Sequence, residues 1–208
     1  MNIYFVTAIG TGSGKTLISS IICEALHADY WKPIQAGLEE VDSVFVTNLI
    51  SNSQSIIYPE QYSLKMPASA NIAAKAEGLS LSLVDFHLPK TSNSIVVEGA
   101  GGILVPINDS GDFIVDLAAK FDCELILVIN LYLGCINHSL LTINELRRRG
   151  LNMKGIIFNG DANTEVENTI LNYSNSPCLF RLATQTNIDK STILAQASLF
   201  LQQNPTIR

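Results

Sequence analysis

Residues 10–16 read GTGSGKT and lie between two stretches of different periodicity. The apolar run at residues 3–6 predicts a buried strand, and the amphipathic stretch that follows the motif predicts a helix. A glycine-rich turn between a strand and a helix is typical of a phosphate-binding loop, where backbone N–H groups and the helix dipole face an anion. Lys15 would add a positive charge, and Thr16 would offer a hydroxyl to Mg²⁺. Ile9 stands where the motif usually has its first glycine, so an ordinary glycine-rich turn is the alternative.

The chain as a whole alternates between short apolar runs and helix-like segments. Strands are predicted at residues 3–7, 94–98, 124–130 and 154–158, with weaker ones near residues 29–32 and 178–182. Helices are predicted at residues 16–27, 113–121, 137–149, 163–172 and 191–203. This alternation specifies a mostly parallel sheet with helices on both faces. Because no segment reads as a linker, we expect residues 1–208 to form a single α/β domain of the P-loop NTPase type, with three α/β/α layers.

The composition fits a buried parallel sheet better than a chain that coats nucleic acid. Of the 208 residues, 47% are hydrophobic and 15% charged, and the net charge is −6. An acidic chain has no general attraction for DNA, and the basic cluster at residues 147–149 is expected at a solvated helix end.

The four cysteines, Cys23, Cys123, Cys135 and Cys178, lack a metal-ligand spacing and are expected to be reduced. No basic leader precedes the first strand, and no apolar run reaches the ~18 residues of a membrane span. We therefore expect a cytoplasmic protein that binds neither nucleic acid nor membranes.

Polar residues follow the predicted strands where each strand ends. Lys15 and Thr16 follow the strand at residues 3–7, Lys32 ends the strand near residues 29–32, and Glu98 ends the strand at residues 94–98. Residues 130–137 follow the strand at residues 124–130, and Asn159 follows the strand at residues 154–158. Loops at the carboxyl ends of parallel strands form the ligand crevice of such a sheet. The sequence therefore predicts one site at this edge.

Two carboxylates are candidates for holding Mg²⁺ together with Thr16. Glu98 ends a fully apolar strand and precedes the glycine-rich residues 99–102, and a buried carboxylate is costly unless it is paired. Asp42 lies at the start of a helical run, where it could equally be the N-cap of that helix. Both residues are oxygen donors of the kind that Mg²⁺ prefers.

Three further features could bind anions or a base. Lys32 ends a strand, and Pro33 and Gly37 make the loop that follows it stiff. There Lys32 could neutralise charge during phosphoryl transfer, or it could be a surface lysine. Residues 133–138 lead into a helix whose free N–H groups suit a carboxylate, although Asn137 could simply cap that helix and His138 is expected in solvent. Asn159 could read a purine edge, but an Asn-Gly turn explains it nearly as well.

Four motifs together resemble the dethiobiotin synthetase family, and the resemblance covers almost the whole chain. They are the loop that ends in Gly14-Lys15-Thr16, KPIQAG at residues 32–37, EGAGG at residues 98–102 followed by Pro106, and GCINH at residues 134–138. The last motif is nearly diagnostic of the family, whereas the phosphate-binding loop names only a superfamily.

The resemblance implies a reaction that joins 7,8-diaminopelargonate, CO₂ and MgATP. One amine becomes a carbamate, ATP phosphorylates it, and the second amine closes a cyclic urea. It also implies catalytic roles for Thr11, Lys15 and Lys32, and a metal site of Thr16, Asp42 and Glu98. The implied nucleotide site is Gly12, Ser13, Gly14, Lys15, Thr16, Leu17, Asp42, Glu98, Gly99, Ala100, Gly101, Asn159, Gly160, Leu182, Ala183 and Thr184.

The resemblance further implies a homodimer with active sites near the subunit boundary. The implied substrate residues are Ala36, Leu133, Gly134, Cys135, Ile136 and Asn137. The chain departs from the family pattern at Ala8, Gly12-Ser13, Ala36, Asn71, Tyr132 and residues 180–183. Ala36 replaces a hydroxyl residue that would bond to the substrate, so one contact is expected to be missing.

Two other functions compete with this interpretation. ATPase switches of the partition and cell-division type share the superfamily, but they carry an extra lysine near the front of the loop, where this chain has Gly10, and often a basic amphipathic tail. A ligase that acts on a related amine substrate is the second alternative. A relative without activity would have lost Lys15, Lys32 or Glu98, and all three are present.

Overall fold

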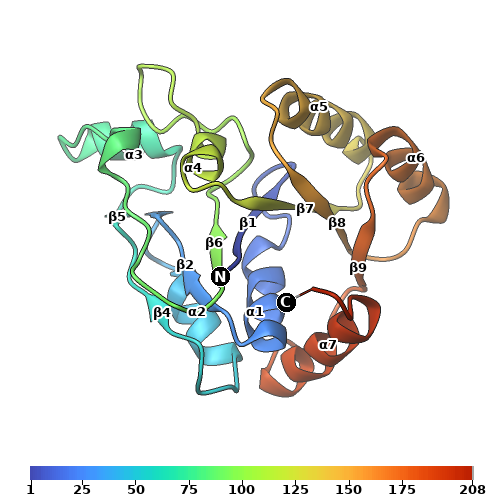
Figure 1. Cartoon of the computed structure of the whole chain (residues 1–208). Helices are drawn as coiled ribbons and strands as arrows, with labels where there is room; N and C mark the ends of the chain where they lie inside the picture. The colour runs from blue at the N-terminus through green and yellow to red at the C-terminus, as the bar shows by residue number, and fades with distance from the viewer. Residues whose placement is uncertain (208) are drawn as a thin grey trace.

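A computed structural model describes residues 1–207 of the chain. Its main sheet contains seven strands in the order β4-β2-β6-β1-β7-β8-β9, and every neighbouring pair is parallel (Figure 1). The strands are β1 (Ile3–Ala8), β2 (Asp29–Trp31), β4 (Ile57–Tyr58), β6 (Ile95–Glu98), β7 (Glu124–Asn130), β8 (Met153–Asn159) and β9 (Cys178–Leu182). A second sheet pairs β3 (Ile34–Ala36) with β5 (Tyr62–Leu64), also in parallel. The predicted strands are confirmed, whereas β3, β4 and β5 were not predicted.

Helices cover both faces of the main sheet, as the alternation predicts (Figure 1). One layer contains α1 (Lys15–Leu26), α2 (Asp42–Leu49) and α7 (Lys190–Gln203). The other contains α3 (Ala70–Ala76), α4 (Ile114–Lys120), α5 (Cys135–Arg148) and α6 (Thr164–Ser174), with a 3-10 turn at Leu83–Asp85. Both α/β class and three-layer architecture are therefore confirmed.

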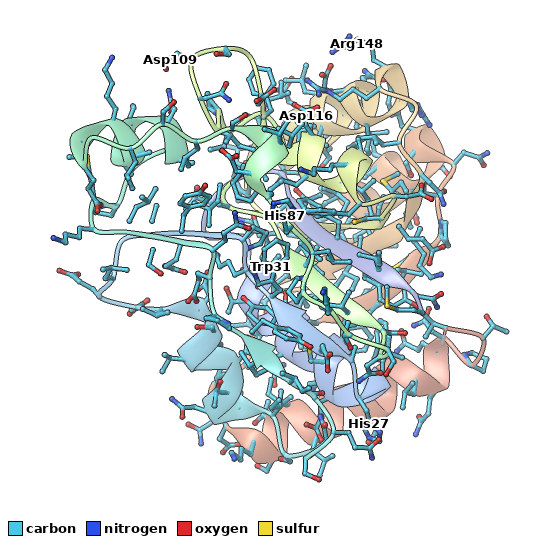
Figure 2. All side chains as sticks on the ribbon, turned by 60° about the vertical axis from the view of Figure 1, so that its left-hand side comes forward. His27, Trp31, His87, Asp109, Asp116 and Arg148 are labelled. Atoms are coloured by element: carbon cyan, nitrogen blue, oxygen red, sulfur yellow. The ribbon has the colours of Figure 1, made fainter. Side chains whose placement is uncertain are left out.

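The period of two along β2 and β6 decides which residues face which helix layer. Tyr30 and its neighbour across the sheet, Val96, lie in the core under α1, α2 and α7. Trp31 and Val97 point to the opposite face and pack in the core under α4. Figure 2 places Trp31 among the densely packed side chains of the interior, whereas Asp109 lies at the rim. Alternate positions of one short strand therefore stabilise two different cores.

The basic residues at 147–149 lie at the carboxyl end of α5 as expected, with Arg147 and Arg148 exposed to solvent, and they also form contacts with neighbouring helices. Arg147 donates to the carbonyl oxygens of Tyr173 and Ser174 at the end of α6. Arg148 pairs with Glu145, and Arg149 pairs with both Glu145 and Asp116. The carboxyl end of α5 is thus joined to α4 and α6 by charged groups.

Candidate active site

The loop of residues 9–14 turns sharply between β1 and α1 because two of its glycines adopt left-handed backbone angles. The φ angles are 72° at Gly12 and 88° at Gly14, and Gly14 is the N-cap of α1. A Cβ on Gly14 would lie 2.2 Å from Nδ2 of Asn159. Only glycine fits this position without moving its neighbour.

Neighbouring strands hold this loop through two asparagines. The Ser13 hydroxyl donates to Oδ1 of Asn130, at the end of β7, with a distance of 2.7 Å. Nδ2 of Asn159, at the end of β8, donates to the Ser13 carbonyl oxygen at 2.9 Å. Asn159 therefore supports the loop directly, a role that sequence reasoning did not assign to it.

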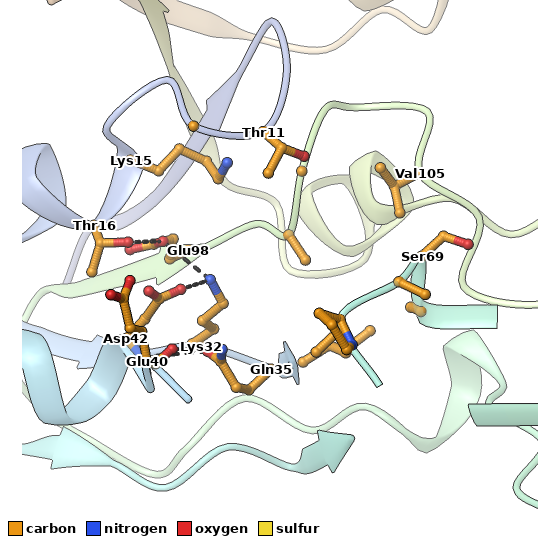
Figure 3. Close-up of a pocket in the computed structure, with 18 of the residues that line it drawn as sticks. Thr11, Lys15, Thr16, Lys32, Gln35, Glu40, Asp42, Ser69, Glu98 and Val105 are labelled. Carbon is orange, nitrogen blue, oxygen red and sulfur yellow. Dashed lines mark hydrogen bonds and ion pairs between the residues drawn. The ribbon is translucent and has the colours of Figure 1, made fainter. Parts of the chain in front are cut away.

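A pocket of about 720 Å³ opens at the carboxyl ends of β1, β2 and β6 (Figure 3). Eleven residues predicted for the site line it: Thr11, Gly12, Gly14, Lys15, Thr16, Lys32, Ala36, Asp42, Glu98, Ala100 and Gly101. Its other walls include Gln35, Glu40, Ser69 and Val105. Residues from four separate chain segments therefore meet at one edge of the sheet.

Two buried lysines enter this pocket from different elements. In Figure 3, Lys15 comes from the start of α1, Lys32 from the end of β2, and Glu98 lies between them. Burial lowers the pKa of Lys15; Glu98 and Asp42 oppose this effect, and the charge of Lys32 adds to it. Burial acts in the same direction on Lys32, but Glu98 and Asp42 outweigh it and raise the pKa of that group. Lys32 is thus a firmly charged ammonium at 5% exposure, not a surface lysine.

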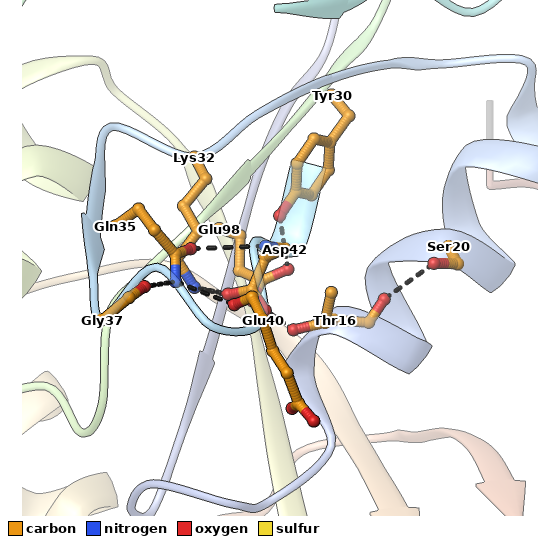
Figure 4. A network of polar contacts seen from close by, with 9 residues as sticks. All are labelled: Thr16, Ser20, Tyr30, Lys32, Gln35, Gly37, Glu40, Asp42 and Glu98. Carbon is orange, nitrogen blue, oxygen red and sulfur yellow. Dashed lines mark hydrogen bonds and ion pairs between the residues drawn. The ribbon is translucent and has the colours of Figure 1, made fainter. Parts of the chain in front are cut away.

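Glu98 is the centre of the polar network in this pocket (Figure 4). Its Oε1 accepts hydrogen bonds from Thr16 Oγ1 at 2.9 Å and from Lys32 Nζ at 3.2 Å. Its Oε2 accepts one from the Tyr30 hydroxyl at 3.0 Å. Glu98 is 1% exposed, and these three donors offset the cost of burying its charge.

Asp42 is brought to Lys32 by a loop that Gln35 braces. Nε2 of Gln35 donates to the carbonyl oxygens of Gly37 at 2.9 Å and Glu40 at 3.2 Å. Its Oε1 accepts from the Asp42 backbone N–H at 3.4 Å. Asp42 is the first residue of α2 and forms an ion pair with Lys32, so the alternative that it caps this helix is wrong.

The loop before α5 lies away from this pocket. Residues 131–136 line a second hollow of about 530 Å³ together with residues 161–163 and Val166. The Leu133 side chain is fully exposed, and Cys135 is buried at the start of α5. Gly134 is the N-cap, so Asn137 lies inside the first turn and does not cap the helix. His138 is exposed in the first turn of α5, as expected, and its ring pairs there with the Tyr132 hydroxyl.

The remaining predicted nucleotide residues lie outside the pocket lining. Gly99 packs toward the core, where a Cβ would lie 3.1 Å from both Phe5 and Ile114. Leu17 packs partly buried against the core. Gly160 donates its N–H to the carbonyl oxygen of Leu182 at 2.8 Å, and residues 183 and 184 are exposed beyond β9.

Sequence reasoning missed Tyr30, Gln35 and Ser69. Tyr30 lies two positions before Lys32, so the strand period alone places both on one face of the sheet. Gln35 belongs to the KPIQAG motif, but nothing in the motif shows that its amide braces the next loop. Ser69 is the N-cap residue of the unpredicted helix α3 and gave no signal.

Two features are absent from the described residues 1–207. None of the helices within residues 1–207 has both the length and the apolar character needed to cross a membrane. Within the same residues, no three His, Cys, Asp or Glu side chains gather into a metal site. Any cation in the pocket would therefore need ligands beyond Asp42 and Glu98.

The sheet order, the glycine-rich turn after β1 and the buried lysine at the start of α1 define a P-loop NTPase. A plasmid partition protein from Borrelia burgdorferi, solved with AMPPNP bound, matches with a TM-score of 0.58 and 13% identity, over 97% of each chain. The MinC:MinD cell division protein complex from Aquifex aeolicus matches with a TM-score of 0.56 and 11% identity, over 100% of this chain and 99% of that one. At these identities the likeness concerns the fold alone.

Sequence comparisons identify the family within this class. A family model described as an AAA domain matches residues 2–192. A protein from Cytophaga hutchinsonii named ATP-dependent dethiobiotin synthetase BioD is 50% identical over 198 residues, which cover 95% of this chain and 96% of the relative. Proteins of the same name from Christiangramia forsetii and Brucella ovis are 42% identical over 198 residues and 43% identical over 178 residues. They cover 95% and 85% of this chain, and 95% and 84% of their own lengths. The chain belongs to the family of ATP-dependent dethiobiotin synthetases, which are ligases.

Proposed function

We propose that this protein converts 7,8-diaminopelargonate, CO₂ and MgATP into dethiobiotin, ADP and phosphate. The observation that carries the proposal is the pair of buried ammonium groups, Lys15 and Lys32, that line one pocket from two elements. A reaction that builds up negative charge on a carbamate and on a transferring phosphoryl group needs fixed positive charge on both sides. Family membership supports this choice over a partition-type switch.

The proposed reaction needs no covalent bond to the protein. One amine nitrogen adds to CO₂ and loses a proton, which gives a carbamate. A carbamate oxygen then attacks the γ-phosphorus of ATP, and ADP leaves. The second amine attacks the carbonyl carbon of the resulting carbamic-phosphoric anhydride and loses a proton, the bond to phosphate breaks, and the cyclic urea closes.

In this proposal, positioning and electrostatics supply the rate. Lys15 holds the phosphate groups of the nucleotide at the start of α1. Lys32 holds the carbamate and the phosphoryl group in transfer. Thr11, which lines the same pocket, donates to the substrate or to a phosphate oxygen. The resemblance implies that Ala36 replaces a hydroxyl residue, so this chain would form one substrate contact fewer there.

The residues around Glu98 fit a magnesium ion. Thr16 and the two carboxylates, Asp42 and Glu98, supply only oxygen donors, which Mg²⁺ prefers. Because these side chains alone are too few for an octahedral shell, the nucleotide phosphates and water would complete it. When bound, the ion would neutralise charge on the phosphate oxygens during transfer.

The nucleotide and the substrate tail are assigned to two further regions. The base would lie against Asn159, Gly160 and residues 182–184, and the phosphates along residues 12–17 and 98–101. The substrate carboxylate would be held by residues 133–137. Because this loop lines a different hollow of its own chain, we propose that a second copy contributes it in a homodimer.

A two-signal assay tests the proposed function. The purified protein is incubated with MgATP and bicarbonate, with and without 7,8-diaminopelargonate, while phosphate release is followed and the cyclic urea is detected by mass spectrometry. We expect phosphate release that depends on the diamine, with dethiobiotin as product, and loss of both signals in Lys32→Ala. Phosphate release that ignores the diamine, with no urea formed, would favour an ATPase switch. Diamine-independent activity that responds to another amine would favour the related ligase.

A further inference from the structure

Tyr30 lies behind the pocket and touches Glu98 from the side that ligands do not reach. It is fully buried in the core under α1, α2 and α7 and does not line the pocket. The period of two along the strand places it on the same face of the sheet as Lys32, next to the carboxyl end of β6. Figure 4 shows its hydroxyl directed at Glu98 from the side opposite to Thr16.

The two oxygens of Glu98 have different neighbours. Oε1 receives the hydrogen bonds of Thr16 at 2.9 Å and Lys32 at 3.2 Å, and both donors line the pocket. Oε2 receives the hydroxyl of Tyr30 at 3.0 Å, which comes from the core. Rotation of the carboxylate plane about its last bond would weaken all three contacts. The phenol therefore helps to fix the plane of the carboxylate, with one oxygen toward the pocket and the other toward the core.

Tyr30 is placed to act as a fixed hydrogen-bond donor. Its hydroxyl lies 3.0 Å from Oε2 of Glu98, and the residue is fully buried and outside the pocket lining. The hydroxyl therefore contacts the carboxylate but not a ligand in the pocket, which leaves it no part in proton transfer.

We propose that Tyr30 is a positioning residue that holds the Glu98 carboxylate in the orientation needed to bind Mg²⁺ with the nucleotide. The role rests on the proposed function only through the magnesium site and does not depend on the amine substrate. It follows that the hydroxyl of Tyr30 affects the magnesium-dependent part of nucleotide affinity more than the magnesium-independent part.

Calorimetry of ADP binding, with and without Mg²⁺, separates these two parts. Mg²⁺ is expected to raise the ADP affinity of the wild type, and in Tyr30→Phe we expect this gain to be about tenfold smaller. That is the size expected for the loss of a hydrogen bond to a charged group. ADP binding without Mg²⁺ should stay unchanged. Tyr4→Phe is the matched control. It removes another buried phenol hydroxyl in the same core, one that accepts from Asn2 Nδ2 at 3.0 Å, and we expect its magnesium effect to equal that of the wild type.

A double-mutant cycle shows whether Tyr30 acts through Glu98. In a Glu98→Gln background, the change Tyr30→Phe should no longer alter the magnesium effect. An equal loss in Tyr4→Phe, an additive loss in the double variant, or an unchanged magnesium effect in Tyr30→Phe would overturn the proposal. So would a wild-type protein whose ADP affinity does not respond to Mg²⁺. Because no diamine is present, a protein that makes no dethiobiotin still gives a decisive result for Tyr30.

Discussion

Strands β2 and β6 bury a carboxylate at each of their two ends, and the two carboxylates have different surroundings. At the amino end, Oδ1 of Asp29 accepts from the Ile56 backbone N–H at 2.9 Å and from Asn93 Nδ2 at 3.3 Å. Its Oδ2 accepts from the hydroxyls of Thr91 at 2.7 Å and Tyr58 at 3.4 Å. Every one of these donors is neutral, and together they join β2, β4 and the segment before β6.

At the carboxyl end, the partners of Glu98 include a charged group and face a pocket. Lys32 bridges Glu98 and Asp42, and Lys15 lies nearby with a pKa that burial lowers. The comparison teaches that a buried charge does not by itself mark an active site. Neutral donors that satisfy a carboxylate indicate a structural role, whereas unlike charges that share an open pocket indicate a binding role.

The largest effect is expected from Lys15→Met. Loss of one charge aimed at the phosphates should lower kcat by about 10²–10³-fold. The free energy of unfolding should stay equal or rise, because the variant no longer buries an ammonium group whose pKa is already lowered. Steady-state kinetics and urea denaturation measure the two quantities. A large loss of stability in Lys15→Met would show that the charged groups at the carboxyl end of the strands also have a structural role, and would contradict the contrast with Asp29.

A matched pair of amide substitutions sharpens the comparison. Asp29→Asn should lower the free energy of unfolding by about 1–3 kcal/mol, because an amide offers one acceptor where four donors converge, and should leave kcat close to that of the wild type. Glu98→Gln should lower kcat by at least about tenfold, since it removes a charged partner of the site. The same assays apply to both variants. If both changes mainly reduced stability, the contrast between structural and binding carboxylates would be wrong.

Proton uptake on nucleotide binding tests the state of Lys15. Burial lowers its pKa in the free protein, so the group loses its proton at a lower pH than an ordinary lysine does. Phosphate favours the charged form, so ADP binding should take up protons, and the uptake should grow from neutral to alkaline pH. Calorimetry in buffers of different ionisation enthalpy measures this number. Lys15→Arg, whose side chain stays charged, should abolish the rise.

The smallest effect is expected at Glu145, a carboxylate near the carboxyl end of α5. Hydrogen bonds from Arg148 and Arg149 lower its pKa from 4.5 to about 2. These hydrogen bonds therefore stabilise the folded protein fully above pH 4.5, and this stabilisation is lost as the pH falls toward 2. The stability difference between wild type and Glu145→Gln should be small at neutral pH and vanish in acid. A difference that grows in acid would contradict this assignment.

The sequence predicts the carboxyl end of the sheet well because its signals are local. The loop at residues 10–16 and the strand that ends in Glu98 carry their own turn and burial signals, and the structure brings both to one pocket. The argument that singled out Glu98 applies equally to Asp29, which also lies in a predicted strand. Only the partners distinguish them, and those come from residues up to 82 positions away along the chain.

Other features could not be predicted because they depend on tertiary contacts. Strands β3, β4 and β5 are two or three residues long and carry no periodicity to detect. The roles of Gln35 and Asn159 depend on carbonyl groups of other loops. The alternative of Asp42 or Asn137 as a helix cap failed for a different reason: each helix begins one or more residues earlier than the polar residue suggested.

Trp31 has a practical consequence that follows from its place in β2. It is the single tryptophan of the chain, it is 2% exposed, and it separates Tyr30 from Lys32. Its ring packs against that of Phe121, with 5.9 Å between the ring centroids, and both rings lie on the face of the sheet opposite to Tyr30. All tryptophan emission of this protein therefore comes from one indole beside the pocket. The native chain contains its own optical reporter, and ligand-induced shifts of β2 can be followed without any attached dye.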